Sequence, residues 1–582
     1  MTPFHSIAPF MKRYWRGYLL GTLILIVVDA LQLITPLIIG SFTDALASGT
    51  LTGSDLIRYI TSIMAIAIGV AIGRFGWRMT LIKTAKTLEY WLRNRVFEHL
   101  EKMSLNYFNH HKTGDLMAHC TNDITAIRNA AGGGMIMFVD GTFMALTTII
   151  IMFTRIDAKL TVIALIPLPL IAIFIITLGR VVGQRFEKVQ EAFSDLTDSA
   201  QETFSGIRII KSFVQEGASV RTFNERNQSN FDKNMRLVKV VGFLQPMVQF
   251  ISMLSTLIAI VYGGALVIDG VITVGNFVSF ITYIGLLSWP MMAIGFVYNQ
   301  LQRGLVSLKR INNILDTPPE IFDLVHADET ATAEPALRVN GLTFTYPGAE
   351  IPALEDIHFA LERGQTMAVV GKTGSGKTTL VNLLLRLYQV DNDMIYFGEK
   401  DINALPIQRI RDIIGYVPQD NFLFSQTVAY NLKFGDPSKG EAEIEAAAKT
   451  AQVYNEILNF PKGFKSELGE RGVNMSGGQK QRVSIARALA KNPKLVILDD
   501  ALSAVDTKTE EAILNHLERA LTDTTTILIA HRISTIKHAD LILVLDHGKI
   551  VERGTHSQLI EMSGIYRDMY EKQLLEDKLS KE

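Results

Sequence analysis

The stretch Thr366-Met367-Ala368-Val369-Val370-Gly371-Lys372-Thr373-Gly374-Ser375-Gly376-Lys377-Thr378 decides the fold of the second half of the chain. Its β-prone apolar part predicts a strand, and the pattern Gly-x-x-x-x-Gly-Lys-Thr predicts a phosphate-binding loop that opens a helix. The glycines let backbone N–H groups close around phosphates, Lys377 reaches the β/γ oxygens, and the Thr378 hydroxyl ligates Mg²⁺. We therefore assign nucleotide binding to residues 371–378 and the adjacent Thr379. The alternative is a glycine-rich turn before an ordinary helix.

The composition indicates two parts of different character. Hydrophobic residues make up 48% of the 582 residues and charged residues 20%, with a mean hydropathy of +0.21. Because both shares are large, the two kinds of residue must be segregated, and the long apolar runs lie before residue 300. The formal net charge of −1 provides no field for nucleic acid, so no nucleic-acid partner is expected. The single cysteine, Cys120, excludes an intramolecular disulfide and is typical of a small packed residue.

Six apolar segments of the first half are long enough to cross a bilayer, which needs about 20 residues per helix. They cover residues 18–40, 56–80, 133–153, 159–179, 241–267 and 276–298. Lys and Arg are concentrated before the first span and in the connections 81–132 and 180–240, whereas the other connections are short and poor in base. By the positive-inside rule both termini are cytoplasmic. Residues 1–16 do not resemble a cleavable signal peptide, and an all-soluble helical protein is not expected to carry six such runs.

The two long connections have helical rather than loop-like periodicity, so we expect them to extend the membrane helices into the cytosol. Each contains a turn-like stretch, at residues 109–115 and 204–208. These turns are candidate contact points for the second half of the chain, and solvated loops between amphipathic helices are the alternative. Ionisable residues within spans are costly, so Asp29, Arg74 and Asp140 are candidates for a polar substrate cavity. The alternative is that they pair structurally or lie near an interface.

The second half begins after a linker at residues 316–336, which follows a transmembrane domain at residues 1–315. From residue 337 to 582 short β-rich runs alternate with helical ones, which predicts an α/β domain with a largely parallel sheet. The run Leu495-Val496-Ile497-Leu498-Asp499 is an apolar strand that delivers a carboxylate at its end. Ligands of such sheets lie beyond the strand ends, so Asp499 is expected to hold Mg²⁺ beside the phosphate loop. A buried strand that ends in a surface Asp is the alternative.

Between these motifs lies Met475-Ser476-Gly477-Gly478-Gln479, and here the sequence resembles the ABC transporter family. The family's signature loop is usually Leu-Ser-Gly-Gly-Gln, so Met475 is a conservative departure. Ser-Gly-Gly at the start of a helix also offers hydroxyl and backbone N–H groups to an anion. The order of six spans, linker and nucleotide-binding domain is similar to that of a half-size ABC exporter. The resemblance thus implies a membrane α-helical domain followed by an α/β P-loop ABC ATPase domain.

The resemblance also implies roles for single residues. Tyr346 is similar to the aromatic residue that stacks on adenine, with a buried strand tyrosine as the alternative. Gln419 resembles the loop glutamine that senses Mg²⁺ and the membrane domain, and it is assigned to both the catalytic and the metal sets. His531 resembles the switch histidine near the γ-phosphate. Residues of the loop that faces the opposite ATP site are Ser503, Ala504 and Asp506.

One departure from the family's pattern narrows the activity that is expected of this chain's own ATP site. Hydrolytic sites of the family carry Glu directly after the Mg²⁺-binding Asp, and this chain has Asp500. An Asp carboxylate is withdrawn by something over an ångström, and a misplacement of that size costs on the order of 10²-fold in rate. In the family, each ATP lies between the phosphate loop of one subunit and the signature loop of the other. The chain therefore resembles the subunit with the non-catalytic site in heterodimeric bacterial multidrug exporters; a slower base at Asp500 is the alternative.

The sequence thus predicts ATP-driven export of amphiphilic compounds by alternating access, with ATP and Mg²⁺ as cofactors. The expected partners are membrane lipid, the amphiphilic cargo and a second ABC half-transporter, and the expected location is a bacterial plasma membrane. A homodimeric lipid flippase and a peptide exporter are the same machine with different cargo. A different class, an ATP-gated channel or regulator, also fits slow hydrolysis. Flux against a gradient would distinguish a pump from a channel.

Overall fold

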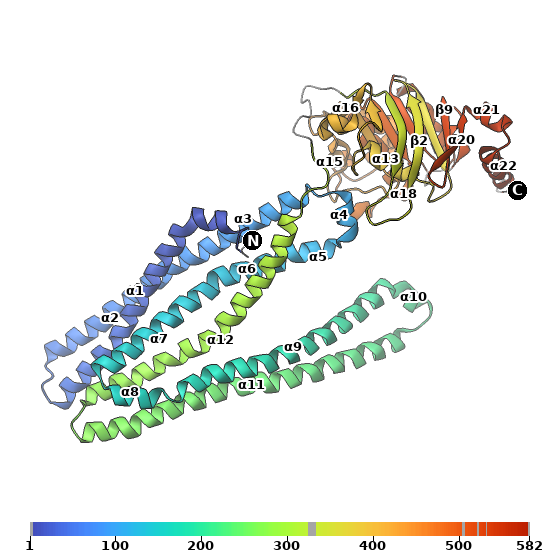
Figure 1. Ribbon diagram of the computed structural model, residues 1–582. Helices are drawn as coiled ribbons and strands as arrows, with labels where there is room; N and C mark the ends of the chain where they lie inside the picture. Colours follow the sequence, from blue (N-terminus) through green and yellow to red (C-terminus); the bar gives the residue numbers. More distant parts are fainter. Residues whose placement is uncertain (1–3, 324–332, 503–506, 521–522, 531, 580–582) are drawn as a thin grey trace. The chain divides into compact units, whose positions relative to one another are not determined.

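The structure is a computed structural model that describes residues 4–323, 333–502, 507–520, 523–530 and 532–579. It divides into two compact units (Figure 1). The helical unit comprises residues 1–101 and 113–317, and the α/β unit comprises residues 102–112 and 318–582. The unit boundaries therefore do not follow the linear order of the chain, because a short stretch of the first half belongs to the α/β unit.

Among its described residues, the helical unit has six helices that are long and apolar enough to cross a membrane, which confirms the expected number of spans. Two of them are interrupted only by π-helical turns, one turn in Gly53–Leu100 and two in Thr113–Arg155, so each of these two reads as one continuous helix. The bounds of the helices and π-turns are α1 Ala8–Ala47, α2 Gly53–Trp77, η1 Arg78–Ile82, α3 Lys83–Leu100, α5 Thr113–Ala118, η2 His119–Asp123, α6 Ile124–Asn129, η3 Ala130–Gly134, α7 Met135–Arg155, α8 Ala158–Leu165, α9 Leu168–Ser205, α10 Ile207–Ser212, α11 Glu216–Ile268 and α12 Val274–Asp316.

These helices extend far beyond the apolar spans, as the periodicity of the two long connections predicted. Helix α11 has 53 residues and is about 80 Å long at 1.5 Å per residue, whereas a bilayer core is about 30 Å thick. It lies side by side with α9 in a hairpin whose tip is α10 (Figure 1). At this tip Phe204, Phe213 and Val214 are 73%, 71% and 79% exposed.

The predicted span at residues 159–179 lies within the apolar helical stretch Ala158–Ser205, which is interrupted by one turn. Helix α8 ends at Leu165 and α9 begins at Leu168, so the chain breaks at Ile166 and Pro167. Proline lacks a backbone N–H, and it lies here at the N-cap of the next helix, where no intrahelical bond is lost. Helices α1, α11 and α12 continue past Pro36, Pro246 and Pro290.

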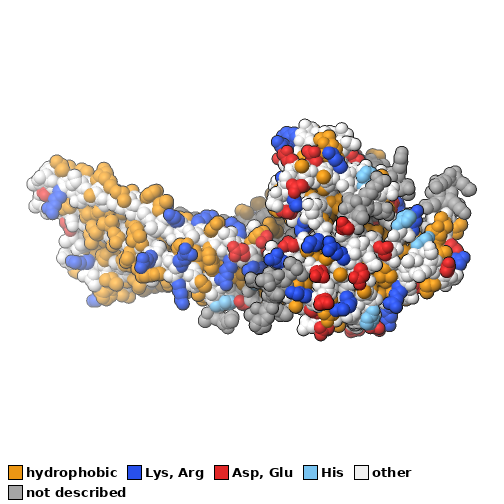
Figure 2. Space-filling model, turned by 90° about the horizontal axis from the view of Figure 1, so that it is seen from above, with side chains coloured by type: hydrophobic (Ala, Val, Ile, Leu, Met, Phe, Trp, Pro, Cys, Tyr) orange, Lys and Arg blue, Asp and Glu red, His pale blue; other side chains and the backbone are white. Residues whose placement is uncertain are grey.

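The surface of the helical unit matches a membrane environment. Ile72, Phe75, Met253 and Val261 are each more than 65% exposed. Hydrophobic side chains gather over these helices, whereas charges of both signs cover the α/β unit (Figure 2). Since burial inside the protein does not shield these apolar side chains, lipid or a partner chain must cover them.

The α/β unit is built on a six-stranded and a four-stranded sheet. The six-stranded sheet has the order β10-β9-β3-β8-β7-β6, and only β10 is antiparallel to its neighbour. The four-stranded sheet has the order β2-β1-β4-β5 and is antiparallel. The strands are β1 Leu337–Phe344, β2 Leu354–Leu361, β3 Thr366–Gly371, β4 Ile395–Phe397, β5 Lys400–Asp401, β6 Ile414–Val417, β7 Leu495–Asp499, β8 Thr525–Ile529, β9 Leu541–Asp546 and β10 Lys549–Gly554.

Helices cover both faces of the larger sheet, because its central strands are apolar on both sides. Met367, Val369 and Ile497 pack into one core cluster, whereas Ala368 and Val496 pack into the other. Continuous burial of this kind is typical of parallel strands. The helices of this unit are α4 Leu105–His110, α13 Lys377–Leu384, α14 Ile407–Ile413, α15 Val428–Lys433, α16 Glu441–Thr450, α17 Tyr454–Leu458, α18 Gly477–Ala490, α19 Thr507–Ala520, α20 Ile533–Ile536, α21 His556–Glu561 and α22 Ile565–Leu579.

Candidate functional site

The phosphate loop joins the end of β3 to the start of α13. Gly376 is the N-cap residue of α13 with a φ of 102°, and a Cβ there would lie 2.6 Å from the side chain of Leu354. Gly374 has a φ of 83°, so both positions adopt a left-handed conformation that favours glycine. The first-turn N–H groups of α13 lack intrahelical partners and point out of the helix. This loop can therefore surround an anion at the helix N-terminus.

Lys377 lies inside the loop. Its Nζ donates to the carbonyl oxygens of Gly371 at 2.8 Å and Lys372 at 2.9 Å, and its side chain is buried. Burial lowers the pKa of the ammonium group, against the opposing charges of Asp499 and Asp500. An ammonium group held in a buried glycine loop suits a polyphosphate, whose negative charge would favour the protonated form.

One cavity of about 340 Å³ collects most of the residues that the motifs singled out. Strands β3 and β7 flank β8 and run parallel to it, so the phosphate loop and Asp499 emerge at the same edge of the sheet. Asp499 is 2% exposed at the end of β7, and Gln419 follows β6. The lining residues are Tyr346, Ala353, Thr373, Gly374, Gly376, Lys377, Thr378, Thr379, Gln419, Asp499, Asp500 and Ile529.

The polar groups of this cavity fit a nucleotide with a divalent cation. The Thr378 side chain is exposed, and Asp499 and Gln419 line the same cavity. Hydroxyl, carboxylate and amide oxygens are the ligands that Mg²⁺ prefers. The buried Ser375 Oγ at the base of the loop has no hydrogen-bond partner among the described residues, which leaves it available to a ligand oxygen.

Tyr346 lies at the rim of the cavity, just after β1. Its hydroxyl is 2.9 Å from the Thr379 hydroxyl, and its ring makes edge contacts with Phe344 and Tyr388 at centroid distances of 5.1 Å. The ring is therefore held in place on its edges, and the half-buried side chain lines the cavity. A fixed aromatic face at this position can stack on a base.

The same aromatic group reaches the stretch 102–112 of the α/β unit. The Asn109 side chain of α4 donates to the Tyr388 hydroxyl at 3.1 Å, and Ser104 and Asn106 donate to the two oxygens of Glu320 at 2.5 and 2.9 Å. The first part of the turn-like stretch at residues 109–115 therefore makes contacts in the α/β unit. This agrees with the prediction that the stretch is a contact point and not a solvated loop. The involvement of Tyr388 was not predicted, because its sequence surroundings carry no motif.

Asp500 lies at the turn that follows β7. Its backbone has a φ of 50°, its N–H donates to the Ile529 carbonyl at 2.8 Å, and its carbonyl accepts from Gln481 at 3.5 Å. Asp is one of the few residues other than glycine that adopt this left-handed conformation readily. These contacts thus fix the position of the Asp500 backbone, from which the short side chain extends.

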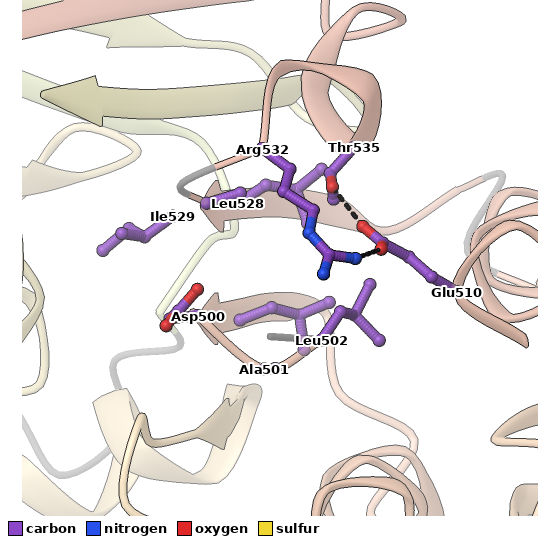
Figure 3. Close-up of a pocket in the computed structure, with 10 residues that line it drawn as sticks. Asp500, Ala501, Leu502, Glu510, Leu528, Ile529, Arg532 and Thr535 are labelled. Carbon is purple, nitrogen blue, oxygen red and sulfur yellow. Dashed lines mark hydrogen bonds and ion pairs between the residues drawn. The ribbon is translucent and has the colours of Figure 1, made fainter. Parts of the chain in front are cut away.

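A second carboxylate lies near Asp500 but serves another contact. Glu510 of α19 is 3% exposed, accepts from Arg532 at 2.5 Å, and accepts from the Thr535 hydroxyl (Figure 3). It lines a separate cavity of about 90 Å³ together with Asp500. Because Glu510 points toward Arg532 and Thr535, it is not positioned as a base for the nucleotide cavity (Figure 3).

The signature residues lie at the start of α18 and do not line the nucleotide cavity of their own chain. Ser476 and Gln479 form a capping box: the Gln479 N–H donates to Ser476 Oγ at 3.3 Å, and the Ser476 N–H donates to Gln479 Oε1 at 3.0 Å. Ser476 and Gly477 are exposed and Gly478 is half-buried, whereas Met475 is packed into the core. The first N–H groups of α18 therefore face outward. Ser503, Ala504, Asp506 and His531 lie outside the described residues.

The intramembrane candidates Asp29, Arg74 and Asp140 come together in the helical unit. Asp29 of α1 is 1% exposed, Asp140 of α7 accepts from the indole N–H of Trp289 at 2.9 Å, and Arg74 of α2 donates to Gln32 at 2.9 Å. Both Asp140 and Arg74 interact with Asp29, so the three residues form one polar group between α1, α2, α7 and α12.

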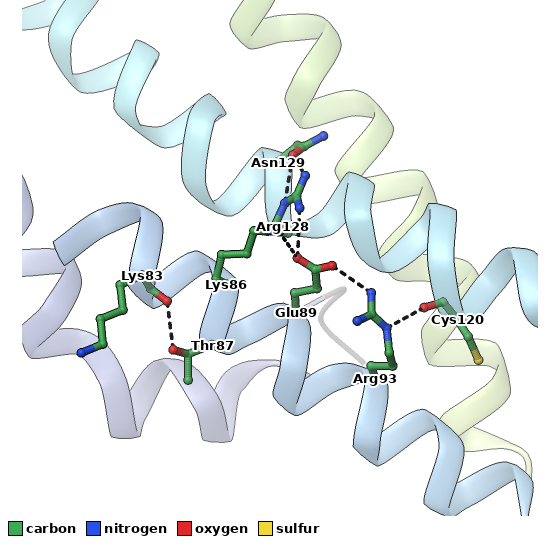
Figure 4. Close-up of polar contacts among 8 residues, drawn as sticks. All are labelled: Lys83, Lys86, Thr87, Glu89, Arg93, Cys120, Arg128 and Asn129. Atoms are coloured by element: carbon green, nitrogen blue, oxygen red, sulfur yellow. Dashed lines mark hydrogen bonds and ion pairs between the residues drawn. The ribbon is translucent and has the colours of Figure 1, made fainter. Parts of the chain in front are cut away.

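A separate ion-pair network holds the base of the helical unit together beyond the 56–80 span. Glu89 of α3 accepts from Lys86 at 3.0 Å, Arg93 at 2.8 Å and Arg128 at 3.0 Å (Figure 4). Arg93 also donates to the Cys120 carbonyl at 3.3 Å, so half-buried Cys120 lies beside this network. Burial of Glu89 opposes ionisation, but the three cationic donors outweigh it and lower the pKa to about 2.

Replacement of Glu89 by Gln is expected to lower the melting temperature by about 2–5 °C at pH 7, since the carboxylate loses three charge-assisted bonds. The contribution is complete above the unfolded pKa of 4.5 and is lost as the pH falls toward 2. The difference between wild type and variant in a pH series of thermal unfolding should therefore shrink below pH 4.5. The matched control Glu98→Gln, an exposed position on the same helix, should show no such trend. A difference that is unchanged down to pH 3 would contradict the role of ionised Glu89.

Comparison with known proteins places the chain in a family. The ABC transporter transmembrane region matches residues 18–291, and the ABC transporter domain matches residues 354–503. YheI of Bacillus subtilis (strain 168), a probable multidrug resistance ABC transporter ATP-binding/permease protein, is 40% identical over 567 residues, which are 97% of each chain. The chain belongs to the ABC transporter family.

Two further relatives define the type of ABC transporter. An ATP-dependent lipid A-core flippase of Syntrophus aciditrophicus (strain SB) is 35% identical over 491 residues, which are 84% of this transporter and 81% of the flippase. The structure of a bacterial Atm1-family ABC exporter with ATP bound has a TM-score of 0.81 and 26% identity, and the match covers 97% of this transporter and 98% of that chain. The transporter is thus a multi-pass membrane protein with an ATP-hydrolysing domain fused to it, a half-transporter of exporter fold.

Proposed function

We propose that this ABC transporter is one half of a heterodimer that exports amphiphilic compounds across a bacterial plasma membrane. The heterodimer is inferred from a difference between the nucleotide cavity and the signature residues of this chain. Asp500 replaces the expected Glu in the cavity of Lys377 and Asp499, whereas the signature residues from Ser476 onward are intact, with Ser476 and Gly477 exposed. This chain would retain ATP in its own slow site and complete a competent site on the partner.

The nucleotide cavity can perform its half of the reaction with residues already placed around it. Lys377 and the N–H groups at the start of α13 would bind the phosphates, and Tyr346 would stack on the base. Thr378, Gln419 and Asp499 would hold Mg²⁺, which neutralises charge on the β- and γ-phosphates. Asp500 would orient water weakly, because its carboxylate is withdrawn from the γ-phosphate side.

Two features of the helical unit support export as a dimer. The exposed aromatic and aliphatic side chains of Phe204, Phe213 and Val214 at the tip of the α9–α11 hairpin are far from the apolar spans, so lipid does not cover them. A second half-transporter would cover them. The polar group of Asp29, Arg74 and Asp140 would contribute to the cargo cavity between membrane helices. The Lys and Arg distribution supports a cytoplasmic location for both termini.

The heterodimer is tested by two variants in the same complex. The transporter is co-expressed with a half-transporter that carries the Glu, and ATPase activity is measured after reconstitution in nanodiscs. Gly477→Asp in this chain is expected to abolish most of the activity, because it blocks the anion site offered to the partner's ATP. Asp500→Asn is expected to leave most of the activity unchanged. The reverse ranking would contradict the asymmetric arrangement.

Export is tested separately by ATP-dependent accumulation of a fluorescent amphiphile in inside-out vesicles. Accumulation against its gradient supports a pump, whereas flux that only dissipates a gradient would favour an ATP-gated channel. A homodimeric lipid flippase is the second candidate, and the sequence relative from Syntrophus aciditrophicus favours it. In that case this chain alone should hydrolyse ATP and move a labelled lipid between leaflets.

A further inference from the structure

The membrane part of the helical unit contains an imbalance of charge. Asp29 of α1 and Asp140 of α7 lie within hydrogen-bonding reach of each other, and Arg74 of α2 is the one cation that acts on Asp29 among the described residues. Helix α12 contributes Trp289, which is neutral. Two carboxylates beside one guanidinium leave one negative charge without compensation, which is costly inside a membrane.

The hydrogen bonds within this group do not satisfy Asp29. Its Oδ2 is buried and has no hydrogen-bond partner among the described residues. Its neighbour Asp140 is also an acceptor, and Asp140 receives the indole N–H of Trp289. Arg74 donates to the Gln32 side chain at 2.9 Å, and no ion pair within 4.0 Å joins it to either carboxylate in the described part of the chain. The missing component is therefore a hydrogen-bond donor with a positive charge.

The packing of the helices makes this arrangement fixed rather than accidental. Helices α1 and α2 approach closely at Gly73, where an added Cβ would lie 2.3 Å from the Val28 side chain. Helices α7 and α12 approach at Gly141, where an added Cβ would lie 3.4 Å from the Cβ of Ala293. The neighbouring residues of these glycines include Arg74 and Asp140, so the small residues bring the charged groups to their positions. Asp29 is enclosed, and half-buried Asp140 with exposed Trp289 leaves one side of the group accessible.

We propose that Asp29 and Asp140 form a binding site for one positive charge that donates a hydrogen bond. A proton shared between the carboxylates would provide it in the absence of cargo, and the ammonium group of an amphiphilic amine would provide it during transport. Binding of the ammonium would release the shared proton to water, so that charge is conserved. Trp289 would add an aromatic face to the amine position. The proposal that an ammonium group supplies the positive charge rests on the proposed export function, whereas the proposal that a shared proton supplies it does not.

The proton source is tested by infrared spectroscopy of the full chain in nanodiscs without nucleotide. We expect a protonated-carboxyl band at neutral pH that shifts in D₂O, disappears in Asp29→Asn and persists in the matched control Asp269→Asn. Asp269 is an exposed residue at the end of α11 with no contribution to the group. The wild-type band itself keeps the test informative if Asp29→Asn does not fold, and Asp140→Asn serves as a second variant.

The amine source is tested by binding of dodecylamine, with 1-dodecanol as the neutral probe of equal chain length and protein-free nanodiscs as the blank. We expect dodecylamine binding to release one proton per amine and to weaken about tenfold or more in Asp29→Asn, as expected for a lost charge-assisted bond. Dodecanol binding should not change. If the protonated-carboxyl band is seen but dodecylamine is not preferred over dodecanol, the site binds a proton. If dodecylamine is preferred but no band is seen, the site binds the cargo amine.

Absence of both the band and the Asp29-dependent amine preference would overturn the proposal. ATP binding is measured on the same samples, which keeps this result separate from the proposed function. Samples that bind ATP but show neither signal contradict only the cation site. Samples with the signals that fail to export in vesicles contradict only the proposed export.

Discussion

Replacement of Asp500 by Glu is expected to raise the ATPase turnover of the chain purified alone by on the order of 10²-fold. The added methylene carries the carboxylate by more than an ångström toward the water that attacks the γ-phosphate. Asp500 already lines the cavity of Lys377 and Asp499, so the substitution changes reach and not location. The measurement is steady-state phosphate release in lipid nanodiscs at saturating ATP and Mg²⁺.

The control for this prediction is Asp500→Asn, which keeps the size of the side chain and removes the base. It should remain as slow as wild type. Because the φ of Asp500 is 50°, a conformation that Glu adopts less readily, the thermal stability of all three proteins is measured as well. Vigorous turnover of the wild type that Glu barely changes would mean a self-sufficient homodimer, and the asymmetric proposal would be wrong.

Replacement of Lys377 by Ala is expected to weaken ATP binding to this chain by roughly 10- to 100-fold, the loss of hydrogen bonds between charged groups. The Lys377 ammonium is held inside the loop by two carbonyl oxygens, so no other described cation reaches the same position. The measurement is equilibrium binding of a fluorescent ATP analogue, which does not depend on hydrolysis or on a partner.

The matched control is Lys372→Ala, five residues earlier in the same loop. The Lys372 side chain is exposed, and only its backbone carbonyl takes part in the described contacts of the loop. Its removal should change affinity less than threefold, a screened surface effect. Equal losses in the two variants would indicate that the loop responds to its overall charge and not to the buried ammonium group.

The parts of the fold that were predictable from the sequence are those set by local patterns. The six spans, the strand before the phosphate loop and the strand that ends at Asp499 are continuous apolar runs. The two strands end within a residue of their predicted bounds, whereas the helices extend well beyond the apolar spans. The antiparallel strands β2, β4, β5 and β10 were not predicted. They are short or alternate between buried and exposed residues, and their pairing depends on partners distant in sequence.

The candidate site shows the same limit. The cavity brings together Tyr346, Lys377, Gln419 and Asp499, whose types and spacing follow motifs. Tyr388 and Glu510 follow no motif, and their roles arise from contacts with Asn109 and Arg532 that lie 279 and 22 residues away in sequence. The break between α8 and α9 was missed for a different reason, because hydropathy does not distinguish one span from two apolar helices joined at a proline.

The composition of the two units bears on how such transporters can be recombined. Residues 102–112 belong to the α/β unit although they are encoded within the first half of the chain. The polypeptide therefore passes between the units three times, at 101/102, 112/113 and 317/318. A chimaera made by exchanging everything after the linker would give the incoming ATPase a foreign α4 and would leave Tyr388 of the donor without its native partner. Successful domain exchange should require transplanting these eleven residues as well.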